Sequence, residues 1–328
     1  MLRRKTRYTN MLTMSGNSNT QTEYEIYRIP VIKALRKYIN QLNGNLSSIE
    51  PILGRVFEEA SSKCFSAEDK VNLKPPLILS KLVSNSVFVL NGILGQNVKF
   101  QEAKHKIETF DAIFVVGAGL SFESDVPMVT DIEDILNFIG ATNYSDLRND
   151  LEMCYNFKDQ FKIIVNRKQP GISHKLIASN FPSKIKEIIS LNWDDLIEKA
   201  FRDSSKPIKK INKETEVKDE NYLWKFHGDV EEYNKGNDHG QLGWIFPDED
   251  GYVFDCFKKY MNDKLDSKLF CLFVIGYSEK DGLIRKVITQ IEGEPPRPTF
   301  RIGMDMGKFH DNFYLLGPSG YVLEQILR

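Results

Sequence analysis

Residues Asp111–Pro127 read DAIFVVGAGLSFESDVP. Its apolar run, residues 112–116, contains three β-branched residues and passes directly into Gly117-Ala118-Gly119. A buried parallel strand that feeds a tight turn into a helix has this form. Small residues let the backbone approach a ligand closely, and N–H groups at a helix start favour a phosphate. We therefore expect a bulky residue at Gly119 to weaken ligand binding more than it unfolds the protein.

The turn departs from the usual dinucleotide fingerprint, because Phe122 stands where the third glycine belongs. A strand followed by Gly-x-Gly also occurs where no ligand binds. The turn alone therefore fits either a structural role or ligand binding, and the residues at the other strand ends must decide between these two roles.

The composition is that of a globular protein, with 41% hydrophobic and 27% charged residues in a chain of 328. This length suits one large domain with an appendage, or two domains. A net charge of −1 gives no support to nucleic-acid binding. The four cysteines form no C-x-x-C pair, which argues against a zinc ribbon or a disulfide framework and fits a reducing cytosol. The four are Cys64, Cys154, Cys256 and Cys271.

We expect a cytoplasmic protein without a membrane span. The apolar runs at 112–116 and 269–275 are too short to cross a bilayer. The basic N-terminus has no apolar core behind it, so no secretory signal is expected.

The N-terminal third reads as helical. Residues 1–24 are polar and are expected to be flexible. Residues 25–108 carry apolar positions at helical spacing, with Pro30 suited to the first turn of a helix. We interpret 25–108 as a region for assembly or restraint, although an integral layer of one domain is an equal alternative because no linker separates it from the rest.

Strands and helices alternate from residue 109 to 328. Further strands are expected at 185–191, 222–226, 269–275 and 299–302, and the charged segment 206–220 is expected to be a loop. Each strand ends in glycine or polar residues. This order predicts an α/β fold with a Rossmann-like, doubly wound parallel sheet, whose ligands lie beyond the carboxyl ends of the strands.

Four strand ends carry polar motifs. The four segments are Gly117-Ala118-Gly119-Leu120-Ser121, Asn192-Trp193-Asp194, His227-Gly228 and Gly276-Tyr277-Ser278. In this order, over residues 109–304, they resemble the motifs of the sirtuin superfamily. The resemblance implies a Rossmann-like sheet that binds NAD and cleaves its nicotinamide–ribose bond.

The resemblance also implies roles for single residues. His227 would act as the base on the nicotinamide ribose, and Asn192 and Asp194 would face the nicotinamide and that ribose. The residues that would hold the rest of NAD are Gly117, Ala118, Gly119 and Ser121 at the pyrophosphate and inner ribose, and Gly276 and Ser278 at the adenosine.

The chain lacks two sequence features of the protein-deacylating sirtuins. No zinc-binding cysteine pair follows His227, and Asp125-Val126-Pro127-Met128-Val129-Thr130 replaces their Gly-Ile-Pro-x-Phe-Arg segment. The segment Asn192–Glu198, NWDDLIE, resembles the middle motif of a zinc-free branch found in bacterial antiphage defence and associated with NAD hydrolysis. Protein deacylation and ADP-ribosyl transfer are correspondingly less favoured.

The sequence therefore predicts a metal-free NAD hydrolase that releases nicotinamide and ADP-ribose. Nicotinamide is a cationic leaving group, so the main requirement is to stabilise an oxocarbenium-like ribose. An enzyme that drains NAD must be restrained, so we expect a homo-oligomer and a partner defence protein. The alternative is a non-catalytic module of the same fold that binds NAD or ADP-ribose within a larger complex.

Each candidate residue also has a structural interpretation. Asn192 or Asp194 would, in isolation, cap the helix that follows. His227 alone would be an ordinary histidine at a strand end, and His174, ahead of a helix, is interpreted as structural. The occurrence of the motifs at successive strand ends is what favours function for Asn192 and His227.

Overall fold

The structure is a computed structural model of the whole chain, and its described part falls into two compact units. The longer described segments are residues 18–41, 50–63, 75–121, 124–127, 129–141, 151–211, 222–225, 269–277, 297–304 and 313–328; residues 259, 285, 288–289, 308 and 311 are described singly or as a pair. The first unit is Met1–Asn97 with Met304–Phe309, and the second is Val98–Gly303 with His310–Arg328.

The first unit is helical, as predicted. Its helices are α2 (Ser18–Gln41), η1 (Glu50–Ile52), α4 (Leu53–Lys63) and α6 (Pro75–Leu94). Apolar side chains at helical spacing form its buried interior: Val31, Leu35 and Ile39 of α2, Val56, Phe57 and Ala60 of α4, and Leu82, Val89 and Ile93 of α6. Tyr38 on α2 donates a hydrogen bond to Asn91 on α6 (3.0 Å).

The expected position of Pro30 in the first turn of a helix is wrong. Helix α2 begins at Ser18 and carries Pro30 in its interior, where the proline ring removes one backbone donor. The helix thus extends into the segment 1–24 that was expected to be flexible; residues 1–17 lie outside the described part.

Among the described residues, one helical stretch, Ile78–Thr109, is long and apolar enough in composition to cross a membrane, with a mean hydropathy of 1.4. The core helices of soluble proteins have the same length and composition. Several of its apolar side chains, including Leu82, Val89 and Phe100, are buried within their own units.

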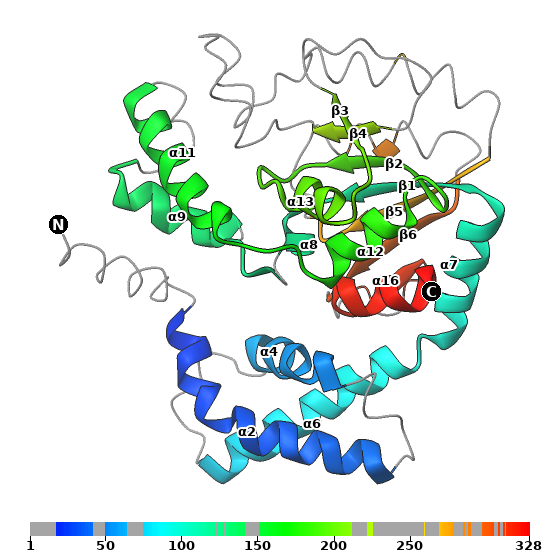
Figure 1. Cartoon of the computed structure of the whole chain (residues 1–328). Coiled ribbons are helices and arrows are strands. Elements are labelled where there is room, and N and C mark those ends of the chain that lie inside the picture. Colours follow the sequence, from blue (N-terminus) through cyan, green and yellow to red (C-terminus); the bar gives the residue numbers. More distant parts are fainter. Residues whose placement is uncertain are drawn as a thin grey trace. The chain divides into compact units, whose positions relative to one another are not determined.

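The second unit is built on a seven-stranded, wholly parallel sheet in the order β3-β4-β2-β1-β5-β6-β7. The strands are β1 (Asp111–Val116), β2 (Ile185–Ser190), β3 (Lys209–Ile211), β4 (Tyr222–Lys225), β5 (Phe270–Ile275), β6 (Thr299–Gly303) and β7 (Tyr314–Leu316). Figure 1 shows β1 between β2 and β5. The predicted doubly wound, Rossmann-like sheet is confirmed.

Two short strands were not predicted. β3 lies inside the segment 206–220 that was expected to be a loop, so that expectation is wrong for Lys209–Ile211. β7 has three residues, Tyr314–Leu316. Both are edge strands paired with one neighbour, and three residues are too few to show a period in the sequence.

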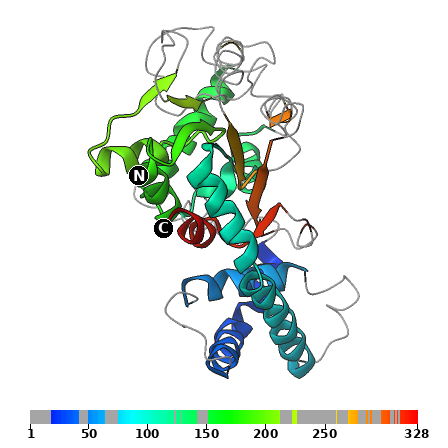
Figure 2. The ribbon, with the colours of Figure 1, turned by 90° about the vertical axis from the view of Figure 1, so that its right-hand side faces the viewer.

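Helices cover the face of the sheet that carries Ala112, Phe114 and Val116. The helices are α7 (Asn97–Thr109), α12 (Ile172–Asn180), α13 (Leu196–Asp203) and α16 (Ser319–Leu327). In Figure 2, α7 and α16 lie side by side, and Phe100 of α7 meets Tyr321 of α16 edge to face (6.0 Å between ring centroids). On the opposite face Ile113 and Val115 are equally buried, as a doubly wound sheet requires.

The second unit includes α7, so its boundary differs from residue 109 given by the sequence. Phe100, Ala103 and Ile107 of α7 belong to the core beneath the sheet. Three further helices complete the described part of this unit: α8 (Ala118–Ser121), α9 (Val129–Phe138) and α11 (Leu151–Asn166).

Candidate functional site

The site is built at the carboxyl ends of β1, β2 and β5, which neighbour one another in the sheet. From β1 the chain forms β2, the edge strand β3 and then β4, which lies between β3 and β2, all on one side of β1, and it then crosses to β5 on the other side of β1. In open α/β sheets the ligand crevice lies where the strand order reverses in this way. The loops after β1 and β5 therefore border the expected binding position.

These two loops are in direct backbone contact. Gly117 N donates to Ile275 O (2.9 Å), and Gly119 N donates to Gly276 O (2.9 Å). A Cβ atom at Gly119 would lie 2.6 Å from Gly276 Cα, and one at Gly117 would lie 2.8 Å from Gly276 O. A side chain at Gly119 would meet the β5 loop of the protein itself, so packing also requires a glycine at this position, and the expected effect of a bulky residue on ligand binding stays a prediction.

Gly276 has the same constraint from the other side. Its φ is +61°, which L-residues rarely adopt, and a Cβ atom there would lie 2.5 Å from Gly119 Cα. Ser278, the other predicted contact of the adenosine, lies outside the described residues.

Ser121 and Asn192 join the first two motifs. Ser121 ends the short helix α8 after β1, and Asn192 follows β2, which pairs with β1 in parallel. The Asn192 side-chain amide donates to Ser121 Oγ (2.9 Å), and both side chains are buried, with 0% exposure for Ser121 and 6% for Asn192. Asn192 thus does not cap α13, since its side chain bonds across the sheet ends instead.

Asp194 stabilises the start of α13, which is the structural role that the sequence left open, although the N-cap residue itself is Asp195. Asp194 Oδ1 accepts a hydrogen bond from Leu196 N at the first position of α13 (3.1 Å). Lys225, the last residue of β4, donates from Nζ to the Asp194 carbonyl (2.6 Å) and forms an ion pair with Glu198 (3.4 Å). Buried Lys225 therefore fixes the loop that carries Asn192 and Asp194.

His174 is the residue that sequence reasoning missed. Its Nε2 lies 3.3 Å from Ser121 Oγ, and its Nδ1 accepts a hydrogen bond from Gly171 N (3.3 Å). The imidazole has no exposed surface, and burial lowers its pKa to about 4. The nearby Asp194 carboxylate raises this pKa, and the Lys225 ammonium lowers it. The sequence signal was the Gln169-Pro170-Gly171 break three residues before His174.

His227 and Gly228 lie outside the described residues, two and three positions after β4 ends at Lys225. The structure thus brings together Gly117, Gly119, Gly276, Ser121 and Asn192. Ala118 lies between the two glycines in the same loop, and Asp194 follows Asn192 in the loop after β2.

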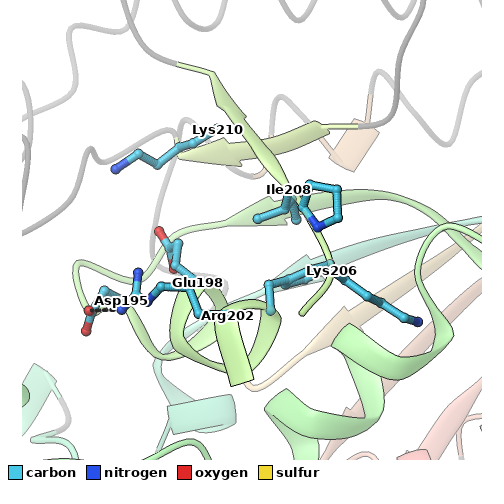
Figure 3. A pocket seen from close by; sticks show the side chains of 8 residues that line it. Asp195, Glu198, Arg202, Lys206, Ile208 and Lys210 are labelled. Carbon is cyan, nitrogen blue, oxygen red and sulfur yellow. Dashed lines mark hydrogen bonds and ion pairs between the residues drawn. The ribbon is translucent and has the colours of Figure 1, made fainter. Parts of the chain in front are cut away.

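A cavity of about 350 Å³ lies along α13 and β3 (Figure 3). Its charged lining residues are Asp195, Glu198, Arg202, Lys206 and Lys210. Asp195 is already paired with Lys199 (2.8 Å) and with Arg202 (3.3 Å). Lys206 Nζ instead donates to the carbonyls that end α12, including Ser179 O (2.6 Å). This cavity is separate from the glycine loops, and its basic groups are engaged with protein partners.

No group of three or more histidine, cysteine, aspartate or glutamate side chains is arranged to hold a metal ion among the residues that the structure describes. Cys271 of β5 is buried, and burial raises the pKa of its thiol to about 12. This thiol therefore stays protonated at neutral pH.

One family profile matches part of the chain. Residues 186–302 match the family profile of the SIR2-like domain, which is a little over a third of the chain. No curated protein matches the sequence at a significant level.

Three of the solved structures that match this chain are Sir2 proteins. A complex of a Sir2 homologue with NAD has 17% sequence identity and a TM-score of 0.46, covering 70% of this chain and 92% of that one. A mutant Sir2 homologue with ADP-ribose has 17% identity and a TM-score of 0.48, covering 70% and 94%. Sir2 bound to an acetylated peptide has 14% identity and a TM-score of 0.44, covering 68% and 94%. The segment 186–302 of this chain is thus similar to the SIR2-like domain.

Proposed function

We propose that the second unit binds NAD at the carboxyl edge of its sheet and hydrolyses the nicotinamide–ribose bond, giving nicotinamide and ADP-ribose. The observation that carries the proposal is the buried hydrogen bond between Asn192 and Ser121 (2.9 Å). It joins the loops after two neighbouring parallel strands at the place where ligands bind in such sheets. The SIR2-like match over 186–302 supports NAD as the substrate, because that match includes the Asn192 motif.

The residues at this edge suit a dinucleotide. The Ser121 hydroxyl and the Asn192 amide are neutral hydrogen-bonding groups, which fit ribose hydroxyls and a carboxamide. The backbone of Gly117, Ala118 and Gly119 would approach the pyrophosphate, with Gly276 and Ser278 toward the adenosine. No metal is required, since the leaving group is already cationic.

The reaction uses one water molecule. The bond between ribose C1′ and the nicotinamide nitrogen breaks, and its electron pair returns to the pyridine ring. The water oxygen bonds to C1′, and the water proton passes to His227, the proposed base. Asn192 would hold the nicotinamide amide or the attacking water. The Asp194 carboxylate would balance the positive charge that develops on the ribose.

We further propose that this activity is a regulated, NAD-depleting effector of bacterial antiphage defence in the cytoplasm. The support is the NWDDLIE segment, Asn192–Glu198, which resembles that branch. Residues 25–108 would serve assembly or restraint through a homo-oligomer and a partner defence protein. In cells, we expect NAD to be lost during phage infection only when the intact chain is present.

A second candidate is a module that binds NAD or ADP-ribose without chemistry. One observation favours it: Asn192 and Asp194 both make structural hydrogen bonds, to Ser121 and from Leu196 respectively. In this alternative the two side chains shape the binding loop, and NAD is held but not cleaved.

The test is incubation of the purified chain with NAD, with nicotinamide release followed over time. Asn192→Ala and His227→Ala are each expected to lower turnover about a hundredfold to ten-thousandfold, while NAD affinity changes much less. Ser179→Ala, on the exposed side of α12, is the control and should keep full turnover. Tight NAD binding with no nicotinamide release, in every oligomeric state obtained, would favour the binding module.

A further inference from the structure

The buried contact between His174 and Ser121 has a defined donor and acceptor. Gly171 N donates to His174 Nδ1, so this nitrogen carries a lone pair and no hydrogen. A neutral imidazole with an accepting Nδ1 carries its hydrogen on Nε2. The burial that lowers the pKa of His174 to about 4 keeps the ring neutral at pH 7. Nε2–H is therefore the donor toward Ser121 Oγ (3.3 Å).

Ser121 consequently accepts two hydrogen bonds. The Asn192 side-chain nitrogen can only donate, and it lies 2.9 Å from the same oxygen. With both lone pairs of Oγ engaged, the serine can use its own hydrogen only as a donor to a third group. Within the described part of the chain, Ser121 Oγ has no further hydrogen-bond partner.

We propose that His174 is a positioning residue: its Nε2–H and the Asn192 amide together hold Ser121 so that the serine hydroxyl donates to an oxygen of bound NAD. The inference rests on the proposed function for its ligand. A buried hydroxyl without an acceptor is costly, so this donor favours a ligand that brings an oxygen to it. The opposite tautomer would turn the serine hydrogen toward His174 and remove that donor.

A purely structural role for His174 makes different predictions. His174 is the third residue of α12, and its contact with Gly171 N also caps the start of that helix. If capping were its whole role, replacing His174 would lower the stability of the fold. The apparent NAD affinity would then fall only as far as the fraction of folded protein falls. The two roles separate when His174 and Ser121 are changed singly and together.

The first measurement needs no NAD. In protein labelled with ¹⁵N-histidine, the ring nitrogens of all five histidines are observable, and His174→Gln identifies the signal of His174. At pH 6 this ring is expected to be neutral with its hydrogen on Nε2. A ring that is protonated at pH 6, or that carries its hydrogen on Nδ1, would overturn the inference.

The second measurement is a double-mutant cycle on NAD affinity, measured by calorimetry in the full chain. His174→Leu is expected to weaken NAD binding about threefold to tenfold, the effect of one lost hydrogen bond. In the Ser121→Ala background the same change should have no further effect. His174→Gln, whose side-chain amide nitrogen can replace Nε2 as the donor, should retain most of the affinity, and Ser179→Ala is the neutral serine control.

The outcomes keep this inference apart from the proposed function. If His174→Leu weakens NAD binding equally with and without Ser121, His174 acts through the fold and the inference is wrong, whatever the turnover. If the cycle shows coupling but nicotinamide is never released, the positioning role stands and hydrolysis fails. Should His174→Leu not fold, the His174→Gln affinity and the tautomer decide the matter. Failure of the wild-type chain to bind NAD would remove both proposals.

Discussion

A Cβ atom at Gly119 would lie 2.6 Å from Gly276 Cα, so the loops after β1 and β5 meet backbone to backbone. Real Cβ atoms do not approach so closely, and neither loop can yield by moving a side chain. We predict that Gly119→Ala lowers the free energy of unfolding by about 1–3 kcal/mol, as overpacking does. Tryptophan fluorescence in urea measures this, because all three tryptophans lie in the second unit.

Gly140→Ala is the matched control for that prediction. Gly140 has a positive φ of +86°, but a Cβ atom there would meet only Met153 Cε, at 3.9 Å. Gly140→Ala should therefore lower the free energy of unfolding only through the strained backbone conformation, by at most about 1–2 kcal/mol. If Gly119→Ala is as stable as the wild type, the two loops are further apart than the structure has them.

Gly119 and Gly276 show what can and what cannot be predicted from the sequence. The strand at 112–116 and the turn after it are evident from five buried apolar residues followed by glycines. The partner of Gly119, however, lies more than 150 residues away, and no local pattern indicates that Gly276 fills the space beside it. The sequence therefore locates the turn correctly, but it does not show that packing against Gly276 also requires this glycine.

His174 shows the same limit for the site. A histidine before an apolar helix reads as structural, and only the parallel pairing of β1 with β2 brings Ser121, Asn192 and His174 together. By contrast, the capping alternative for Asp194 was open from the sequence, because its hydrogen bond is to Leu196, two residues away. Local contacts were predictable, and contacts across strands were not.

Asp194 allows its cap and its charge to be tested separately. Asp194→Ala loses the acceptor for Leu196 N and should cost about 0.5–2 kcal/mol of stability. Asp194→Asn keeps an oxygen at that place and should retain most of the stability while it removes the negative charge. We expect both variants to lose NAD turnover if the charge serves the chemistry. Full turnover in Asp194→Asn would show that the residue acts only as a cap.

Glu187 is a buried carboxylate in the middle of β2. Its Oε2 accepts hydrogen bonds from Tyr222 N (3.2 Å) and from Trp224 Nε1 (3.0 Å), and so ties β4 to β2. Glu187→Leu removes the acceptor from both donors and should cost about 1–3 kcal/mol. Glu187→Gln keeps one amide oxygen as an acceptor and should cost less. Urea unfolding of both variants measures the difference, and equal stabilities would mean that this acceptor contributes little.

The last prediction concerns pH and the imidazole of His174. Burial lowers its pKa from the ordinary 6.5 to about 4, with the Asp194 carboxylate opposing this shift and the Lys225 ammonium adding to it. Between these two values the unfolded chain binds a proton that the folded chain does not. The stabilisation is therefore fully present above about pH 6.5 and is lost as the pH falls toward 4, at up to about 1.4 kcal/mol per pH unit.

Other groups titrate in the same range, so the contribution of His174 is obtained by difference. Urea unfolding of the wild type and of His174→Gln at pH 7, 6 and 5, followed by tryptophan fluorescence, gives the two slopes. The wild type should lose more stability than the variant between pH 6 and pH 5, because glutamine binds no proton in the unfolded chain. Since the protonated ring would also present a hydrogen to Gly171 N in place of an acceptor, the acid form cannot keep the hydrogen bonds seen at Nδ1. Parallel slopes for the two proteins would mean that His174 has the same pKa in the folded chain as in the unfolded chain. The buried cluster with Ser121 and Asn192 would not then exist in solution.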